Sequence, residues 1–178
     1  MNSNATPFRY DDRTVRLHWL TVALVVTLWL LGQTIDEFPK GMPRVGARSL
    51  HILLGATLAF VLSYRIWWRS TSGARLPAVE KDKLQPIVSL YHLALYAVMV
   101  ATVLAGLSNA WVRGDNILGL FRIPEFDPGN KDLRQTVEDL HAVLANTLFI
   151  GAALHAVFGF VHHFVMKDNV LRRMRRLR

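Results

Sequence analysis

Four long apolar blocks constrain this chain more than any other feature of its sequence. They lie at about residues 13–35, 46–69, 86–111 and 134–165, separated by polar stretches that contain glycine and proline. A helix needs ~20 mostly apolar residues to cross a bilayer core, and each block reaches that length. The block interiors are apolar on every side, whereas a soluble helix has one apolar stripe and one charged face. The sequence therefore predicts an all-α integral membrane four-helix bundle, with residues 1–178 as a single domain in a lipid bilayer.

The chain contains no cysteine. This excludes disulfides, iron–sulfur clusters, thiolate ligation of haem and covalent haem attachment. The first block is also unlike a cleavable signal peptide, because it is long, contains His18 and is followed by no small-residue cleavage site. Any iron must therefore be held by histidine or methionine, and any haem must be bound non-covalently.

The charged residues are distributed unequally between the two sides of the predicted bundle. If the N-terminus is cytoplasmic, that side carries 14 Lys/Arg against 5 Asp/Glu, a net +9, and the other side carries 7 against 8, a net −1. Cationic flanks stay on the cytoplasmic side of a bacterial inner membrane, so both termini are expected there. The basic C-terminal segment RRMRRLR then anchors the chain near anionic lipid. This interpretation leaves no role for nucleic acid.

Two histidines of the fourth block are spaced for two separate sites. His141 and His155 are 14 residues apart, which places both rings on one helical face and roughly 21 Å apart along the axis. That distance is too great for one metal ion. Instead, it suits two stacked sites, one near each membrane surface.

Histidines of two other blocks lie at matching depths. His51 is near the outer start of the second helix, level with His141, and His18 is near the inner start of the first helix, towards His155. Each pair comes from two different helices, as a haem clamped between two imidazoles requires. Histidine inside a membrane helix is itself a functional-site hypothesis. The four residues are therefore expected to be the axial iron ligands of two haems b.

Several neighbours extend this hypothesis. Arg65 follows His51 by 14 residues and would either pair with a propionate of the inner haem or extend to the interface as an anchor. His162 shares a helical face with His155 and His92 lies at a similar depth, so each would bind a propionate, a quinone carbonyl or a backbone group. Three small residues lie one helical turn from the predicted ligands, namely Gly55, Gly151 and Gly159. They are expected to leave room for a flat macrocycle, although small residues also let helices approach each other.

Other chemistries fit the pattern less well. Structural zinc needs four converging ligands, usually including cysteine, and two pairs some 21 Å apart do not converge. No zinc-protease, nucleophile-elbow or phosphate-loop pattern is present. A haem-free four-helix scaffold with four unrelated histidines stays open.

The sequence resembles the bacterial cytochrome b561 family over nearly its whole length. The resemblance rests on RLHWL around His18, LHILLG around His51, DLHAVLAN around His141 and ALHA around His155. The segments WVRGDN and HHFVMKDNVLRRM also resemble the family. Within the family, the chain is most similar to small stand-alone superoxide:ubiquinone oxidoreductases.

The resemblance implies an inner-membrane enzyme that oxidises superoxide on the periplasmic side and passes electrons through two haems to ubiquinone. Steering of the superoxide anion is expected from outer-loop cations, namely Lys40, Arg44, Arg48, Arg113 and Arg122. The quinone site is expected at the inner haem, near His92, His162 and Lys167. The alternative is an electron-transfer subunit that links a periplasmic dehydrogenase, or another donor protein, to the quinone pool.

Overall fold

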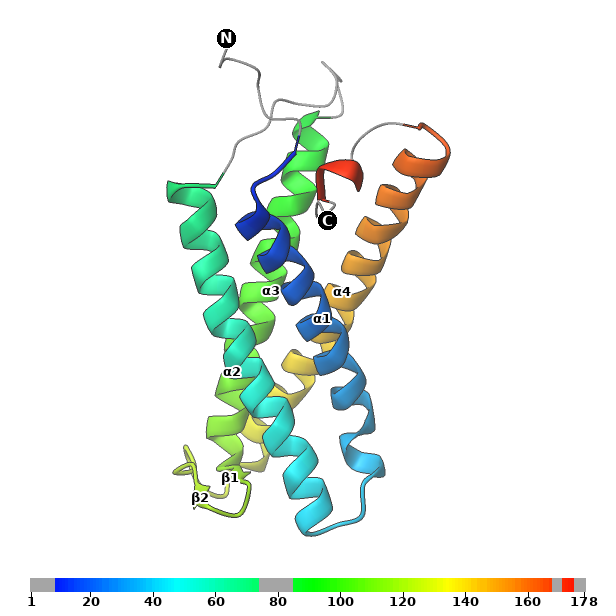
Figure 1. Cartoon of the computed structure of the whole chain (residues 1–178). Coiled ribbons are helices and arrows are strands. Elements are labelled where there is room, and N and C mark those ends of the chain that lie inside the picture. The colour runs from blue at the N-terminus through cyan, green and yellow to red at the C-terminus, as the bar shows by residue number, and fades with distance from the viewer. Residues whose placement is uncertain (1–8, 74–84, 168–170, 175–178) are drawn as a thin grey trace.

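The computed structural model describes residues 9–73, 85–167 and 171–174, and this part of the chain contains four long helices (Figure 1). They are α1 (Asp12–Thr34), α2 (Met42–Thr71), α3 (Gln85–Arg113) and α4 (Lys131–Phe164). All four are long and apolar enough to cross a membrane, which confirms the predicted all-helical class with four helices that could span a bilayer. Six cations counted on the cytoplasmic side lie outside the described residues: Arg75, Lys81, Lys83, Arg175, Arg176 and Arg178.

Polar residues fix where the helices begin. The Asp11 carboxylate accepts hydrogen bonds from the Thr14 backbone N–H at 2.8 Å and the Thr14 hydroxyl at 2.7 Å, and so caps α1. The Asn130 side chain caps α4 in the same way. α2 begins at Met42 rather than near residue 46, because Pro43 fits the first turn of a helix, where its missing N–H has no helical partner to lose.

The helices form an elongated antiparallel bundle (Figure 1). α1 packs mainly on α2 and α3 on α4, while α2 and α3 join the two pairs. By contrast, α1 and α4 touch little, and α2 and α4 hardly meet within the described helices. One end carries the α1–α2 connection and a short β-hairpin, and we call it the hairpin end. The opposite end carries the start of α1 and the end of α4, and we call it the terminal end.

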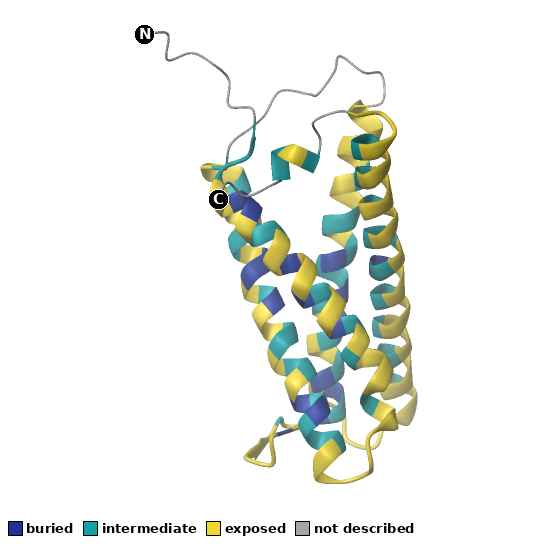
Figure 2. Ribbon diagram, turned by 45° about the vertical axis from the view of Figure 1, so that its right-hand side comes forward, coloured by how far each residue is buried: buried dark blue, intermediate teal, exposed yellow. Residues whose placement is uncertain are grey.

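The buried apolar core lies midway between these two ends. Many other large apolar residues are exposed, and Figure 2 shows exposed residues along all four helices. A helix that is apolar all round and little buried within its own protein is suited to lipid. α4 is the extreme case, with one buried residue in its described length. The core comprises Leu24, Leu28, Leu58, Val61, Leu62, Met99 and Leu148.

The α3–α4 connection contains a feature that the sequence did not predict. Strands β1 (Asn116–Ile117) and β2 (Phe121–Arg122) pair in an antiparallel hairpin. Ser49 of α2 holds it in place: its hydroxyl, fully buried, lies 3.1 Å from the Asn116 carbonyl and accepts a hydrogen bond from the Leu118 N–H at 2.8 Å. The hairpin is therefore fastened to α2 at the hairpin end. The remaining short elements are the 3-10 helices η1 (Ile35–Glu37) and η2 (Leu171–Met174).

Candidate functional sites at two histidine pairs

His51 of α2 and His141 of α4 face each other near the hairpin end. Their ring centres are 6.1 Å apart and the rings are at 89° to each other. A metal–imidazole bond of ~2 Å on each side of an ion, plus roughly 1 Å from each ligating nitrogen to its ring centre, places two opposed imidazole centres about 6 Å apart. The observed separation therefore fits one metal ion held between the two rings.

The backbone of α3 sets the orientation of the His141 ring. Its Nδ1 lies 3.1 Å from the Thr102 carbonyl oxygen. A carbonyl can only accept, so Nδ1 carries the proton and Nε2 keeps its lone pair. Histidine ligands commonly donate their second ring N–H to a carbonyl in this way, which fixes both the tautomer and the ring orientation.

Two glycines give these imidazoles room. A Cβ atom added to Gly106 of α3 would lie 2.8 Å from Cε1 and 3.2 Å from Nδ1 of His141. A Cβ added to Gly32 of α1 would lie 3.4 Å from Cε1 of His51. Gly106 is therefore needed for the close approach of His141 to the α3 backbone. Neither glycine was among the small residues predicted to line a haem site.

The second pair lies near the terminal end. The rings of His18 in α1 and His155 in α4 have centres 6.5 Å apart, with the planes at 75°. This geometry also fits one metal ion between two imidazoles. On α4 the two pairs are 14 residues apart, so about 21 Å of helix separates them. The core residue Leu148 lies midway between them.

Arg65 of α2 reaches into the terminal-end pair. Its Nη2 lies 3.1 Å from Nδ1 of His18, and its guanidinium carbon is 5.2 Å from the centre of the Tyr96 ring. Its Nε is buried and has no hydrogen-bond partner among the residues that the structure describes. Arg65 therefore lies beside His18 and Tyr96, inside the terminal end of the bundle.

A third imidazole stands beside this pair. The ring of His92 in α3 is centred 5.0 Å from that of His155, which is closer than two ligands on opposite sides of one metal ion. His92 Nδ1 is 2.7 Å from the Val88 carbonyl oxygen, so the ring proton sits on Nδ1 and Nε2 carries a lone pair. The Tyr91 ring also stacks with that of His155, 6.4 Å away.

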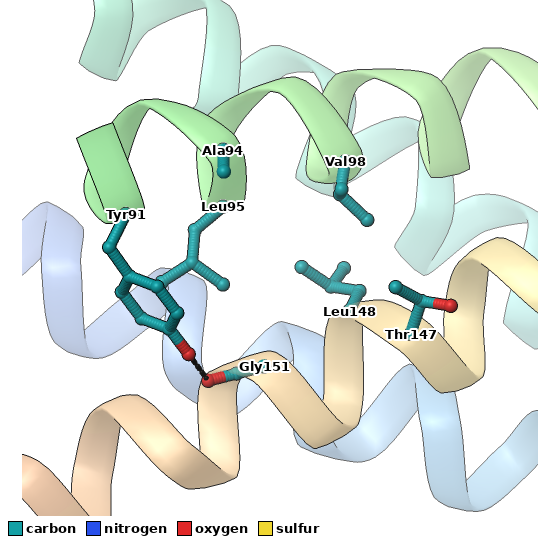
Figure 3. Close-up of a pocket in the computed structure, with 7 residues that line it drawn as sticks. All are labelled: Tyr91, Ala94, Leu95, Val98, Thr147, Leu148 and Gly151. Carbon is teal, nitrogen blue, oxygen red and sulfur yellow. Dashed lines mark hydrogen bonds between the residues drawn. The ribbon is translucent and has the colours of Figure 1, made fainter. Parts of the chain in front are cut away.

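The predicted role of Gly151 receives no support from its surroundings. A Cβ there would meet Leu95 of α3 at 3.0 Å, and the Tyr91 hydroxyl donates to the Gly151 carbonyl at 2.7 Å (Figure 3). Gly151 therefore allows α3 and α4 to approach each other. By contrast, a Cβ at Gly55 or Gly159 would meet nothing within 4 Å, so both positions keep open space beside His51 and His155.

An alternating network of charges covers the hairpin end. Arg44 and Arg48 both pair with Asp36, and Arg48 also pairs with Asp115. Arg113 pairs with Asp115 at 3.7 Å and with Glu138 at 2.7 Å, and so connects the two carboxylates. Burial raises the pKa of the Asp115 carboxyl above its usual value, against the opposing effect of the Arg113 guanidinium. The network thus contains three of the predicted steering cations, and three carboxylates match their charge.

The remaining predicted residues lie at the two ends of the bundle. His162 is half-buried near the end of α4, and Lys167 is exposed just beyond it with a φ of 55°. Arg122 of β2 donates to the Gly114 carbonyl at 2.8 Å, and Lys40 is exposed in the α1–α2 connection. His162 and Lys167 therefore share the terminal end with His18 and His155.

Comparison with known proteins identifies the family. Residues 9–176 match the family described as prokaryotic cytochrome b561. The chain belongs to this family. Its members are membrane cytochromes that bind haem b and transfer electrons. The residues of each pair fit that group, because a haem iron takes two axial imidazoles and each pair presents two at the required separation.

Individual relatives cover almost the whole chain at modest identity. A probable superoxide oxidase of Yersinia pestis is 26% identical over 170 residues, which is 93% of this chain and 95% of the relative. Cytochrome b561 homolog 2 of Escherichia coli K12 is 27% identical over 180 residues, with 98% and 95% covered. Cytochrome b562 of Cereibacter sphaeroides is 24% identical over 177 residues, with 95% and 96% covered.

Proposed function

We propose that this cytochrome holds two haems b and carries electrons from superoxide to ubiquinone across the bacterial inner membrane. One haem lies between His51 and His141 and the other between His18 and His155. The observation that carries the proposal is the pair of ring separations, 6.1 and 6.5 Å, each suited to one iron between two imidazoles. The similarity to a probable superoxide oxidase supports the choice of electron donor.

We further propose that the hairpin end faces the periplasm and the terminal end faces the cytoplasm. The excess of Lys and Arg on the terminal side supports this orientation. Haem b bound at each pair would supply one-electron redox chemistry there. Two superoxide anions each lose one electron and leave as dioxygen, while one ubiquinone gains two electrons and two protons and leaves as ubiquinol.

Arg65 is proposed to pair with a propionate of the terminal-end haem. For its Nε2 to bind iron, His18 must keep the ring proton on Nδ1, and Nδ1 then no longer accepts from Arg65. A carboxylate close to the guanidinium is the strongest acceptor that could replace it. The buried Nε of Arg65, which has no partner in the described residues, supports the same assignment.

His92, His162 and Lys167 are proposed to bind ubiquinone at the terminal end. His92 is exposed, and its Nε2 lone pair can accept a hydrogen bond or hold a proton beside the His155 ring. His162 lies two turns beyond His155 on the same face of α4. Lys167 adds a donor for a quinone carbonyl from the surface.

Arg44, Arg48 and Arg113 are proposed to attract superoxide at short range. Their charges are matched by Asp36, Asp115 and Glu138, so the network has little net field at a distance. Superoxide would therefore be attracted electrostatically by the nearest guanidinium group, and not by a broad positively charged surface.

The test is a direct assay. Protein purified without oxygen, with its haems oxidised, is mixed with a superoxide source, and the reduced haem absorbance and ubiquinol are followed together. We expect haem reduction that superoxide dismutase abolishes, followed by ubiquinol formation at one quinol per two superoxide anions. Haem that stays oxidised under superoxide would reject the proposed donor.

One observation favours a second candidate, an electron-transfer subunit that receives electrons from a donor protein. Leu120 is 82% exposed and Phe121 is 60% exposed on the β-hairpin, at the end nearest to the His51 pair. Exposed apolar residues of this kind often mark a contact surface. If superoxide fails in the direct assay, this surface is where a donor protein is expected to dock.

A further inference from the structure

The two histidine pairs lie in different electrostatic surroundings. At the hairpin end, three arginines alternate with three carboxylates in one connected network. At the terminal end, Arg65 lies beside His18 and no carboxylate of the described residues forms an ion pair with it. Its neighbour Tyr96 offers the face of an aromatic ring, which stabilises a cation without cancelling its charge.

A fixed cation changes the redox equilibrium of an adjacent iron. Reduction adds one negative charge, and a positive charge a few ångströms away in a medium of low dielectric constant stabilises the reduced form. The Arg65 guanidinium lies within hydrogen-bond distance of the His18 ring, so its charge acts on that site far more than on the other. On α2, Arg65 stands 14 residues from His51, about 21 Å along the helix.

From this asymmetry, and given the proposed haem at each pair with a propionate of the terminal-end haem on Arg65, we infer that Arg65 offsets the negative charge of that propionate and thereby raises the reduction potential of the terminal-end haem above that of the hairpin-end haem. Arg65 thereby sets the direction of electron transfer. Electrons that enter at the hairpin end move downhill to the terminal end, where the quinone is reduced. The neutral charge network around Arg48 and Arg113 has the complementary effect, because it adds no net positive charge beside the hairpin-end haem.

Other charges face the terminal-end pair less closely. Arg13 lies over the Trp68 ring, 4.3 Å from its centre, and Arg69 lies over the Tyr10 ring at 5.1 Å. Both are nearer the end of the bundle than Arg65. Arg69 is one turn further along α2, and it provides a matched control of the same residue type on the same helix.

The test is a spectroelectrochemical titration of the holoprotein in lipid nanodiscs, with both haems bound. In Arg65→Gln, the reduction potential of the terminal-end haem should be lower than in the wild type. The equilibrium should shift at least tenfold towards the oxidised haem, which corresponds to about 59 mV for a one-electron couple. The hairpin-end haem should be unchanged. Arg65→Lys should keep most of the wild-type potential, and Arg69→Gln should shift it far less than Arg65→Gln does.

Assignment of the two waves uses His141→Ala, in which the remaining wave belongs to the terminal-end haem. If Arg65→Gln does not retain that haem, Tyr96→Glu takes its place, because a carboxylate beside the guanidinium should lower the same potential. Equal shifts in the reduction potentials of both haems would overturn the inference. So would a change of less than twofold in the equilibrium between oxidised and reduced terminal-end haem in these variants. Wild-type protein without two haems would instead reject the proposed function itself, so the two failures are distinguishable.

Discussion

Substitution of Gly106 by alanine should weaken only the hairpin-end haem. The added Cβ would lie 2.8 Å from Cε1 of His141, and α3 backbone on one side leaves the imidazole little freedom to move away. Overpacking of this kind costs about 1–3 kcal/mol, and 1.4 kcal/mol corresponds to tenfold in affinity. The ring would also lose its hydrogen bond to Thr102, and loss of such a supporting contact costs 10- to 100-fold in metal affinity.

The two effects act on one ring and are only partly additive, so we expect haem affinity at this site to fall by roughly 10- to 1000-fold. The assay is the transfer of haem from the purified protein to an excess of a soluble haem acceptor, followed by absorbance. Gly106→Ala should release one haem quickly and retain the other. The helix itself should not suffer, because alanine is the better helix former by about 1 kcal/mol.

Gly46→Ala is the matched control, since a Cβ at that helical position meets nothing within 4 Å. It should release haem at the wild-type rate. If Gly106→Ala and Gly46→Ala behave alike, or if Gly106→Ala weakens both haems equally, the reasoning from the close approach to His141 is wrong.

Three further substitutions separate the parts of the proposal. Ser49→Ala removes the fully buried hydroxyl that accepts from the Leu118 N–H, and it should destabilise the fold by about 1 kcal/mol, seen as a lower Tm, whereas Ser63→Ala should leave the Tm nearly unchanged. His162→Ala should slow ubiquinol formation several-fold while both haems stay bound, and an unchanged rate would remove His162 from the quinone site. Arg113→Gln removes one guanidinium and leaves a carboxylate of the network unmatched, so haem reduction by superoxide should be slower than in the wild type, most of all at low salt; an unchanged rate at every salt concentration would count against the proposed attraction.

The histidine pairs could be anticipated because they depend on helical geometry alone. A rise of 1.5 Å per residue and 100° per residue place His141 and His155 on one face and at two depths. The alternation of spans then assigns His51 and His18 to those depths. Arg65 follows from the same rule, since it is the residue 14 positions after His51.

Contacts between helices could not be anticipated in the same way. The glycines that matter for His51 and His141 are Gly32 and Gly106, which lie on other helices, and the rotation of one helix against another is set by packing rather than by spacing. Gly151 illustrates the converse, because it is one turn from His155 yet lies against Leu95 of α3.

The ion pairs at the hairpin end also could not be predicted from the sequence. Arg48 and Asp115 are far apart in the chain and meet only because the hairpin folds back over α2 through Ser49. A count of loop charges therefore gave the near-neutral net value, but not the connected network in which three guanidinium groups alternate with three carboxylates. That alternation is what separates short-range attraction from long-range steering.

The central claim is that two haems are bound by two independent histidine pairs, and haem b quantified per polypeptide tests it most directly. We expect two haems in the wild type, with one in His141→Ala and one in His155→Ala, and with different spectra for the haem that each variant retains. A single haem in the wild type, or two single-histidine variants that retain the same haem, would contradict the account.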